Sequence, residues 1–272
     1  MKVKKRALQT LVIAATMLGL TACGQEEARV IKVGATVGPH AQVVEAVAKE
    51  AKAHGLNVQV VEFSDFITPN AALADGSIDI NSYQHLPFLT NFNQSRNADL
   101  VSIGQSILMR MGIYSDSVKS LSDLPQNARI AIPNDPTNGG RGLLLLQEAK
   151  LITLKENVGH KASINDIVDN PKNFKIIEVD AAQLPRTLSD VDAAAITMNY
   201  VMSSGLNPKE KAIYLEPKDA ALAVMVIATK AENKDNPDYK KFVEIYQSQT
   251  IRDYLATTFN GTIEPNADRL AT

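Results

Sequence analysis

The sequence has few of the residues and motifs on which disulfide frameworks, metal sites and hydrolytic centres are built. Its 272 residues include one cysteine, so no disulfide can form within the chain. It contains no G-x-S-x-G elbow, no P-loop and no G-x-G-x-x-G loop. Its four histidines are scattered and none has H-x-H or H-E-x-x-H spacing: His40, His54, His85 and His160. We therefore expect no metal site, no cofactor and no enzymatic activity.

Positive charge is also scarce once the N-terminal segment is set aside. Removing residues 1–22, which hold four basic and no acidic residues, changes 28 basic and 30 acidic residues into 24 and 30, a net charge of −6. An acidic body with few basic runs argues against nucleic acid as a partner. It equally argues against attachment to an anionic membrane by charge alone.

The N-terminus has the pattern of a secretory signal. Basic residues from Lys2 to Arg6 precede an apolar stretch, Ala7–Leu20, which is shorter than the roughly 20 residues that a membrane span needs. The tetrapeptide that ends in Cys23, Leu-Thr-Ala-Cys, resembles the bacterial lipobox, in which the cysteine is lipidated and becomes the first residue. We expect a signal peptide over 1–22, a tether over 23–29, and a protein anchored by lipid at Cys23 on the periplasmic or extracellular face of a membrane. The alternative is an ordinary signal peptide with a chance cysteine.

Hydrophobic periodicity alternates between strand and helix along the rest of the chain. Apolar residues at helical spacing over 41–54 lie between two strand patterns, 31–36 and 57–63. Further strands are expected over 129–132, 175–179, 193–197 and 224–229, with helices over 141–151 and, as one long helix, 239–259. This alternation predicts an α/β protein with largely parallel sheets.

Two apolar stretches suggest that the chain forms two lobes. Residues 102–115 are too long for one ordinary strand, and a crossing strand between lobes fits them. The stretch near 220–229 would return the chain. We assign 30–109 plus 218–272 to lobe one and 110–217 to lobe two.

Aromatic residues gather in the stretch FSDFITPNAALADGSIDINSYQHLPF, residues 63–88. Tyr83 and His85 follow an expected short strand over 78–80, and ligands in open α/β sheets lie beyond the carboxyl ends of strands. With Phe66 and Phe88 they predict an aromatic-lined pocket. Each ring, taken singly, could equally belong to the core.

The stretch PNDPTNGGRG, residues 133–142, places Arg141 among turn-forming residues at an expected helix start. An arginine there can hold a carboxylate through two parallel hydrogen bonds, aided by the helix dipole. Asn199, which could also be a turn residue, can accept from an ammonium group. These parts together predict a receptor for a zwitterion with an apolar tail.

Several ordered motifs resemble one protein family over about residues 31–261. They are IKVGAT (31–36), GPHA (38–41), the aromatic stretch, IPNDPTNGGRG (132–142), NPKNFKIIEVDAAQLPR (170–186) and FNG (259–261), besides the lipobox. They are very similar to the NlpA lipoprotein family, whose best-known members are the methionine-binding lipoproteins of bacterial methionine ABC importers.

The resemblance implies a two-lobed periplasmic-binding-protein fold of type II-like architecture, with the ligand in the cleft between lobes. It also implies delivery of methionine or a close analogue to an ABC permease driven by an ATPase. The ligand-contacting positions of the family fall on Phe66, Tyr83, His85, Phe88, Arg141 and Asn199.

The sequence departs from the family at one position. Many methionine binders have an asparagine in the strand where this chain has Met225. Loss of that amide leaves open weaker methionine binding, or a preference for D-methionine, another small amino acid or a short peptide. A lipoprotein enzyme and an adhesin remain as alternatives from other classes.

Overall fold

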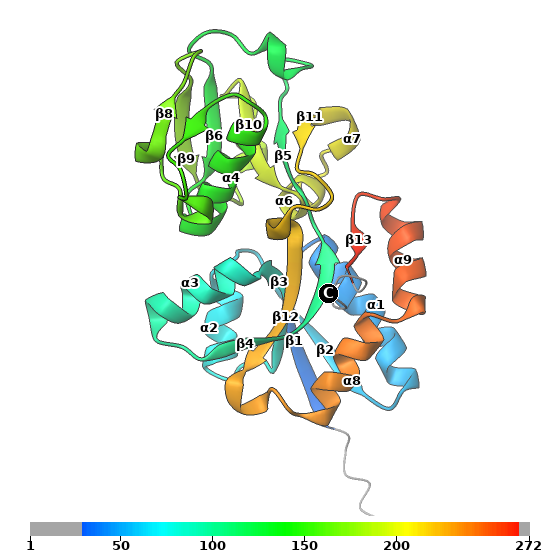
Figure 1. The fold of residues 1–272 in the computed structure, drawn as a ribbon. Helices are drawn as coiled ribbons and strands as arrows, with labels where there is room; N and C mark the ends of the chain where they lie inside the picture. Colours follow the sequence, from blue (N-terminus) through cyan, green and yellow to red (C-terminus); the bar gives the residue numbers. More distant parts are fainter. Residues whose placement is uncertain (1–28, 267–272) are drawn as a thin grey trace, which may run out of the picture.

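The computed structural model describes residues 29–266 and builds them around two β-sheets (Figure 1). In the first sheet, parallel strands at one edge are continued by antiparallel strands at the other. The six strands of this sheet, in spatial order, are β13 (Glu264–Pro265), β4 (Leu100–Leu108), β12 (Val224–Lys230), β3 (Ile80–His85), β1 (Val30–Thr36) and β2 (Asn57–Phe63).

The second sheet repeats this mixed design. Strands β6, β9 and β10 pair in parallel, while β5 and β11 extend the sheet in antiparallel fashion. The five strands, in spatial order, are β11 (Ala212–Leu215), β5 (Met111–Tyr114), β10 (Ala193–Thr197), β6 (Arg129–Pro133) and β9 (Lys175–Val179). A separate pair joins β7 (Thr153–Leu154) to β8 (Ile167–Asp169). The predicted α/β class is confirmed, but the expectation of largely parallel sheets is wrong, because antiparallel strands return the chain between the two sheets.

Helices cover both faces of each sheet (Figure 1). Those of the six-stranded sheet are α1 (Pro39–Ala53), α2 (Thr68–Ala74), α3 (Leu86–Arg96), α8 (Pro237–Tyr246) and α9 (Gln249–Phe259). Those of the five-stranded sheet are α4 (Pro136–Glu148), α5 (Leu184–Thr187), α6 (Met198–Ser203) and α7 (Pro208–Lys211). Short 3-10 helices lie at Leu121–Asp123, Gly159–Lys161, Ile164–Asp166, Ala221–Ala223 and Ala231–Asn233.

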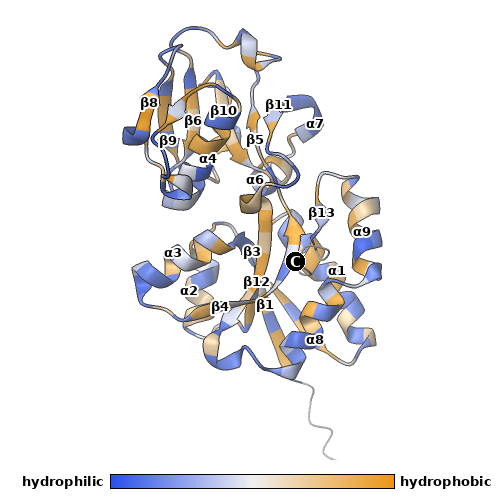
Figure 2. Cartoon of the chain, in the orientation of Figure 1, coloured by the Kyte–Doolittle hydropathy of each residue, from blue (hydrophilic) through white to orange (hydrophobic). Residues whose placement is uncertain are grey.

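Apolar residues are frequent on the strands of both sheets (Figure 2), and buried apolar side chains pack on both faces of each sheet. One face of the six-stranded sheet packs against α1, α8 and α9, and the other packs against α2 and α3. The five-stranded sheet packs α4 on one face and α5 with α6 on the other. The core is therefore divided between the two sheets.

The chain passes between the sheets twice. The predicted single crossing strand over 102–115 is instead two strands, because β4 ends at Leu108 and β5 begins at Met111. Met109 and Arg110 connect them. The return runs from Glu216 to Ala223, between β11 and β12.

The predicted helix over 239–259 is also two helices. Helix α8 ends at Tyr246, and Ser248 begins α9 by accepting a hydrogen bond from the Ile251 amide. The spacing of the apolar residues predicted one helix that was too long, because an N-cap serine does not disturb that spacing.

None of the helices formed by residues 29–266 has the length and hydropathy needed to cross a membrane. The predicted signal peptide and the lipidation at Cys23 lie outside the described residues.

Candidate functional site: a polar and aromatic pocket between the sheets

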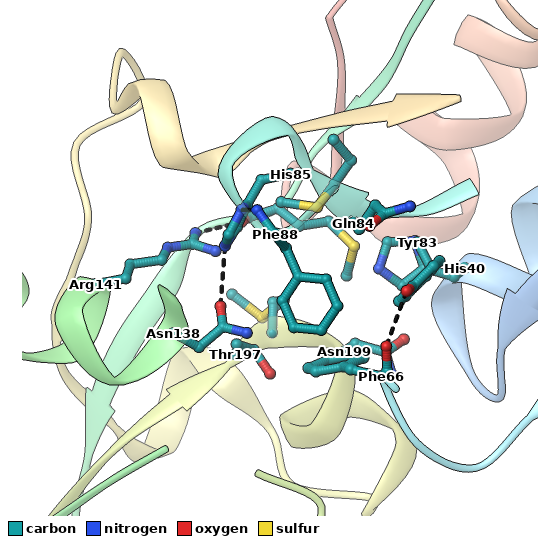
Figure 3. A pocket seen from close by; sticks show the side chains of 13 residues that line it. His40, Phe66, Tyr83, Gln84, His85, Phe88, Asn138, Arg141, Thr197 and Asn199 are labelled. Carbon is teal, nitrogen blue, oxygen red and sulfur yellow. Dashed lines mark hydrogen bonds between the residues drawn. The ribbon is translucent and has the colours of Figure 1, made fainter. Parts of the chain in front are cut away.

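All the residues predicted to contact a ligand line one cavity (Figure 3). The two sheets both contribute to it. Its lining is His40, Phe66, Tyr83, Gln84, His85, Phe88, Met109, Asn138, Arg141, Thr197, Met198, Asn199 and Met225. The structure thus brings together predicted contact residues that are up to 133 positions apart in the sequence, from Phe66 to Asn199.

Strand β3 supplies one wall of the pocket. The sequence predicted a strand that ended at Ile80, but the strand begins there and is buried along its whole length, to His85. Tyr83 is therefore inside the strand and His85 is its last residue. His85 also caps α3, because its Nδ1 accepts a hydrogen bond of 3.1 Å from the Phe88 amide. One short segment thus fixes three residues of the wall.

The rings of this wall contact one another and reach the opposite side of the pocket. The centroid of Phe66 lies 6.1 Å from that of Tyr83 and 6.4 Å from that of Phe88. The Phe66 centroid also lies 4.5 Å from that of Tyr200, a residue of helix α6, which packs on the five-stranded sheet. The Tyr83 hydroxyl donates to the Phe66 carbonyl oxygen at 2.8 Å, which holds the loop bearing Phe66 against the strand.

Behind the rings, a buried amide network holds β3 to α2. The Asn70 Nδ2 donates to the Gln84 Oε1 at 2.7 Å, and Gln84 Nε2 donates back to Asn70 Oδ1 at 2.7 Å. Asn81 joins by donating to Asn70 Oδ1 and accepting from Gln84. Since these amides satisfy one another, Gln84 is fixed where it lines the pocket.

Helix α4 begins earlier than the sequence predicted, at Pro136 and not at Arg141. Asp135 is its N-cap and accepts a hydrogen bond of 2.9 Å from the Asn138 amide. Glycines at the start of a pattern lower its helical propensity, which is why the expected start was too late. Arg141 consequently lies in the second turn of α4. The predicted contribution of the helix dipole therefore applies at the residues that precede Arg141.

The glycines of the PNDPTNGGRG stretch serve helix packing. A Cβ on Gly139 would lie 2.8 Å from the Pro133 carbonyl oxygen, and one on Gly140 would lie 2.1 Å from that of His160. The glycines let α4 approach β6 and the 3-10 helix at 159–161.

Arg141 meets a carboxylate of the protein itself. Its Nε donates to Glu216 Oε1 at 2.7 Å, and its Nη2 donates to Glu216 Oε2 at 2.5 Å and to the Met109 carbonyl oxygen at 2.9 Å. The side chains of Arg141 and Glu216 are 3% and 5% exposed. The two parallel donors that were predicted to hold a ligand carboxylate are thus already bonded to Glu216. Of the guanidinium nitrogens of Arg141, Nη1 alone makes no hydrogen bond to the described part of the chain.

Three buried polar atoms of the lining have no hydrogen-bond partner among the described residues: His40 Nδ1, Thr197 Oγ1 and Asn199 Oδ1. Asn199 is in helix α6, so its reading as a turn residue is excluded. Its Nδ2 donates to the Val37 carbonyl oxygen at 3.3 Å, which leaves Oδ1 as an acceptor. Buried polar atoms without partners are costly, and their concentration in one cavity indicates a place for a polar group of a ligand.

Both histidines of the pocket are neutral. Burial lowers the pKa of His40 to about 3. Burial, followed by the positive charge of Arg141, lowers the pKa of His85 to about 3. Since His85 Nδ1 accepts from Phe88, its Nε2 carries the proton and donates to Asn138 Oδ1 at 3.1 Å. This bond joins the walls contributed by the two sheets.

Comparison with known proteins places the chain in one family. The NlpA lipoprotein family matches residues 31–267. The chain belongs to this family. The α/β fold with a cleft between two lobes, predicted from the sequence, agrees with the solved structures that it resembles.

Several proteins similar to this chain have informative names. The chain is 43% identical over 249 residues to the D-methionine-binding lipoprotein MetQ of Escherichia coli K12, which covers 90% of this chain and 92% of that protein. A nutrient-binding protein from Burkholderia cenocepacia, solved bound to methionine, matches with a TM-score of 0.84 and 45% identity over 87% of this chain and 99% of its own. An ABC transporter, periplasmic substrate-binding protein from Coxiella burnetii matches with a TM-score of 0.83 and 40% identity over 87% of this chain and 100% of its own.

Sequence reasoning missed several residues that surround the pocket. Glu216 has no local motif, and its partner lies 75 positions away. His40 lies in the GPHA stretch, where a histidine after a glycine-proline turn at a helix start was the available signal. Thr197 and Met109 were assigned to expected strands, and Met198 was not singled out. Met225 was noted only as the position where many methionine binders have an asparagine. The thioethers of the lining belong to Met109, Met198 and Met225.

Residues 29–266 contain no group of three or more histidine, cysteine or acidic side chains arranged to hold a metal ion.

Proposed function

We propose that this NlpA-family chain is a lipid-anchored receptor that captures methionine, or a close analogue, and delivers it to an ABC import permease and its ATPase. One observation carries the proposal. A single cavity combines a guanidinium, three unpaired polar atoms, three aromatic rings and three thioethers, which matches a zwitterionic head and an apolar, sulfur-bearing tail.

The head of the ligand fits the polar side of the cavity. The free Nη1 of Arg141 can donate to the carboxylate, and such a charge-assisted hydrogen bond contributes about 1.5–3 kcal/mol. Asn199 Oδ1 can accept from the α-ammonium, and Thr197 Oγ1 offers a second acceptor. These contacts need no protein carboxylate.

The tail fits the aromatic side. The Phe66, Tyr83 and Phe88 rings lie within 6.4 Å of one another, centroid to centroid, and leave space between them and the thioethers. Sulfur–aromatic contacts add about 0.3–1.5 kcal/mol each. The names of the relatives, which specify methionine and D-methionine, favour this tail over others. On this side the chain has the thioether of Met225 where many methionine binders have an asparagine amide. The choice between L-methionine and D-methionine is therefore left to experiment.

The two segments that join the sheets are then hinges. We propose that residues 30–109 with 218–272 form lobe one and residues 110–217 form lobe two, which close on the ligand. Three hydrogen bonds that join the two sides support this: His85 to Asn138, Asn199 to Val37, and Tyr200 to the Ser64 carbonyl at 3.5 Å. Lipidation at Cys23 would hold the receptor beside its permease.

The proposal is tested by ligand-induced stabilisation of the mature chain. L-methionine and D-methionine are titrated, with leucine and glutamate as controls. A ligand at 100 times its Kd stabilises by about 2.7 kcal/mol, which raises the Tm of a chain this size by about 5–10 °C. One isomer of methionine, or both, should give this shift.

The matching variant removes the guanidinium without leaving a buried charge. In the double variant Arg141→Met with Glu216→Gln, the amide oxygen introduced at position 216 still accepts from the Met111 amide, so folding is retained while the ligand carboxylate loses its donor. The shift with methionine should disappear. If the double variant still gained as much as the parent, the site would be wrongly assigned.

A further inference from the structure

Glu216 lies where both segments that join the sheets meet. Its Oε2 accepts from the Met111 amide at 2.6 Å, its own amide donates to the Met111 carbonyl at 3.0 Å, and its carbonyl accepts from Arg110 Nη1 at 3.3 Å. These contacts fix a carboxylate directly behind Arg141. Glu216 does not itself line the cavity.

The pair of Glu216 and Arg141 leaves the pocket without net charge. Of the described residues that line the cavity, Arg141 alone is charged, since both histidines are neutral. Two other carboxylates act electrostatically on the lining residue Tyr83, those of Asp65 and Asp135. Both are partly exposed and accept from backbone amides, at a turn and at the start of α4. The guanidinium charge is therefore already balanced before a ligand arrives.

A balanced arginine changes which ligands can be accepted. A lone carboxylate would bring an uncompensated negative charge into a buried site, which is costly. A zwitterion brings its own cation, for which neutral acceptors without partners among the described residues are in place at Asn199 and Thr197. An arginine without Glu216 would instead favour the lone anion.

We propose that Glu216 is a specificity-determining, positioning residue: by holding and neutralising Arg141, it makes the pocket select ligands whose head group has no net charge. This inference rests on the proposed function. It adds to that function a rule for the ligand class, set by a residue outside the cavity.

The test compares two ligands with the same tail in two proteins. L-methionine is a zwitterion, and 4-(methylthio)butanoate has the same thioether and carboxylate without the amine. Calorimetric titration at pH 7.5 gives the ratio of their dissociation constants for the mature chain and for Glu216→Gln. The parent should prefer methionine, and Glu216→Gln should move the ratio toward the anion by at least about tenfold. The control Glu62→Gln removes an exposed carboxylate on β2 and should leave the ratio unchanged.

A merely structural role would lower both affinities together. An unchanged ratio in Glu216→Gln, with both ligands still bound, would overturn the inference while leaving the proposed function intact. Glu216→Asp, which keeps the charge on a shorter side chain, should retain the parent ratio. Should Glu216→Gln fail to fold, the parent protein alone still tests the inference. If it bound 4-(methylthio)butanoate as tightly as methionine, or more tightly, the inference would be contradicted. If D-methionine proves to be the ligand, it replaces L-methionine in the comparison. Failure of the parent to bind either isomer would defeat the proposed function itself.

Discussion

The two walls of the pocket tolerate buried polar groups in different ways. The wall from the six-stranded sheet carries rings and neutral imidazoles, and burial lowers the pKa of both His40 and His85 to about 3. The wall from the five-stranded sheet keeps a full positive charge on Arg141, which is matched by Glu216. A group that can release its proton becomes neutral on burial, whereas an arginine needs a partner. The first wall is therefore sensitive to pH and the second to loss of its partner.

The largest effect is expected from breaking the charged wall on one side only. Arg141→Ala leaves the Glu216 carboxylate buried at 5% exposure without its main partner. Removing one member of a buried pair destabilises by about 3–5 kcal/mol, and the free energy of unfolding in urea without ligand should fall by this amount. The double variant Arg141→Met with Glu216→Gln should recover most of it. A single variant as stable as the parent would contradict this account of the pair.

Acid should break the neutral wall. Because the pKa values of His40 and His85 in the folded chain lie near 3, below the ordinary value of 6.5, the unfolded chain binds protons first as the pH falls. The stability that the two neutral histidines contribute is fully present above about pH 6.5 and is lost progressively toward pH 3. Between pH 7 and 5.5 the free energy of unfolding should fall by about 1.3 kcal/mol for each histidine.

Urea unfolding at the two pH values measures this loss. His40→Gln should remove about half of the histidine-dependent part. A His40→Gln variant with the full pH dependence of the parent would show that His40 does not stay neutral on folding.

A smaller effect should sharpen the comparison by moving the helix that carries the charged wall. Gly140→Ala places a Cβ 2.1 Å from the His160 carbonyl oxygen, so α4 must shift. We expect a loss of about 1–3 kcal/mol in the free energy of unfolding, with weaker methionine binding as a consequence. The matched control is Gly142→Ala, whose Cβ would meet Ile132 and Ala195 at 3.4–3.5 Å. It should stay within about 1 kcal/mol of the parent, because alanine is the better helix former. Equal stability of the two variants would argue against a packing role for Gly140.

The sequence predicted best what local patterns determine. Alternating patterns located most strands of the two sheets, but they indicated no helix at α2, α3, α5, α6 or α7. The aromatic stretch and Arg141 were found because unusual residue types are concentrated there. Errors arose where a tertiary contact overrides a local preference. Glycines suggested a loop before Arg141, but they lie in α4 because its packing leaves no room for a Cβ. The link from Arg141 to Glu216 spans 75 positions, and no periodicity or motif reveals such a pair.

The three thioethers of the lining have a consequence for which molecules the receptor accepts. Unbranched side chains with several rotatable bonds rearrange at little cost, so Met109, Met198 and Met225 form a deformable part of the cavity lining. The Arg141 guanidinium and the Asn199 amide are held by hydrogen bonds and cannot shift in the same way. Selection should accordingly be strict for the amino-acid end and permissive for chain length, so that ethionine and norleucine compete with methionine while its methyl ester does not.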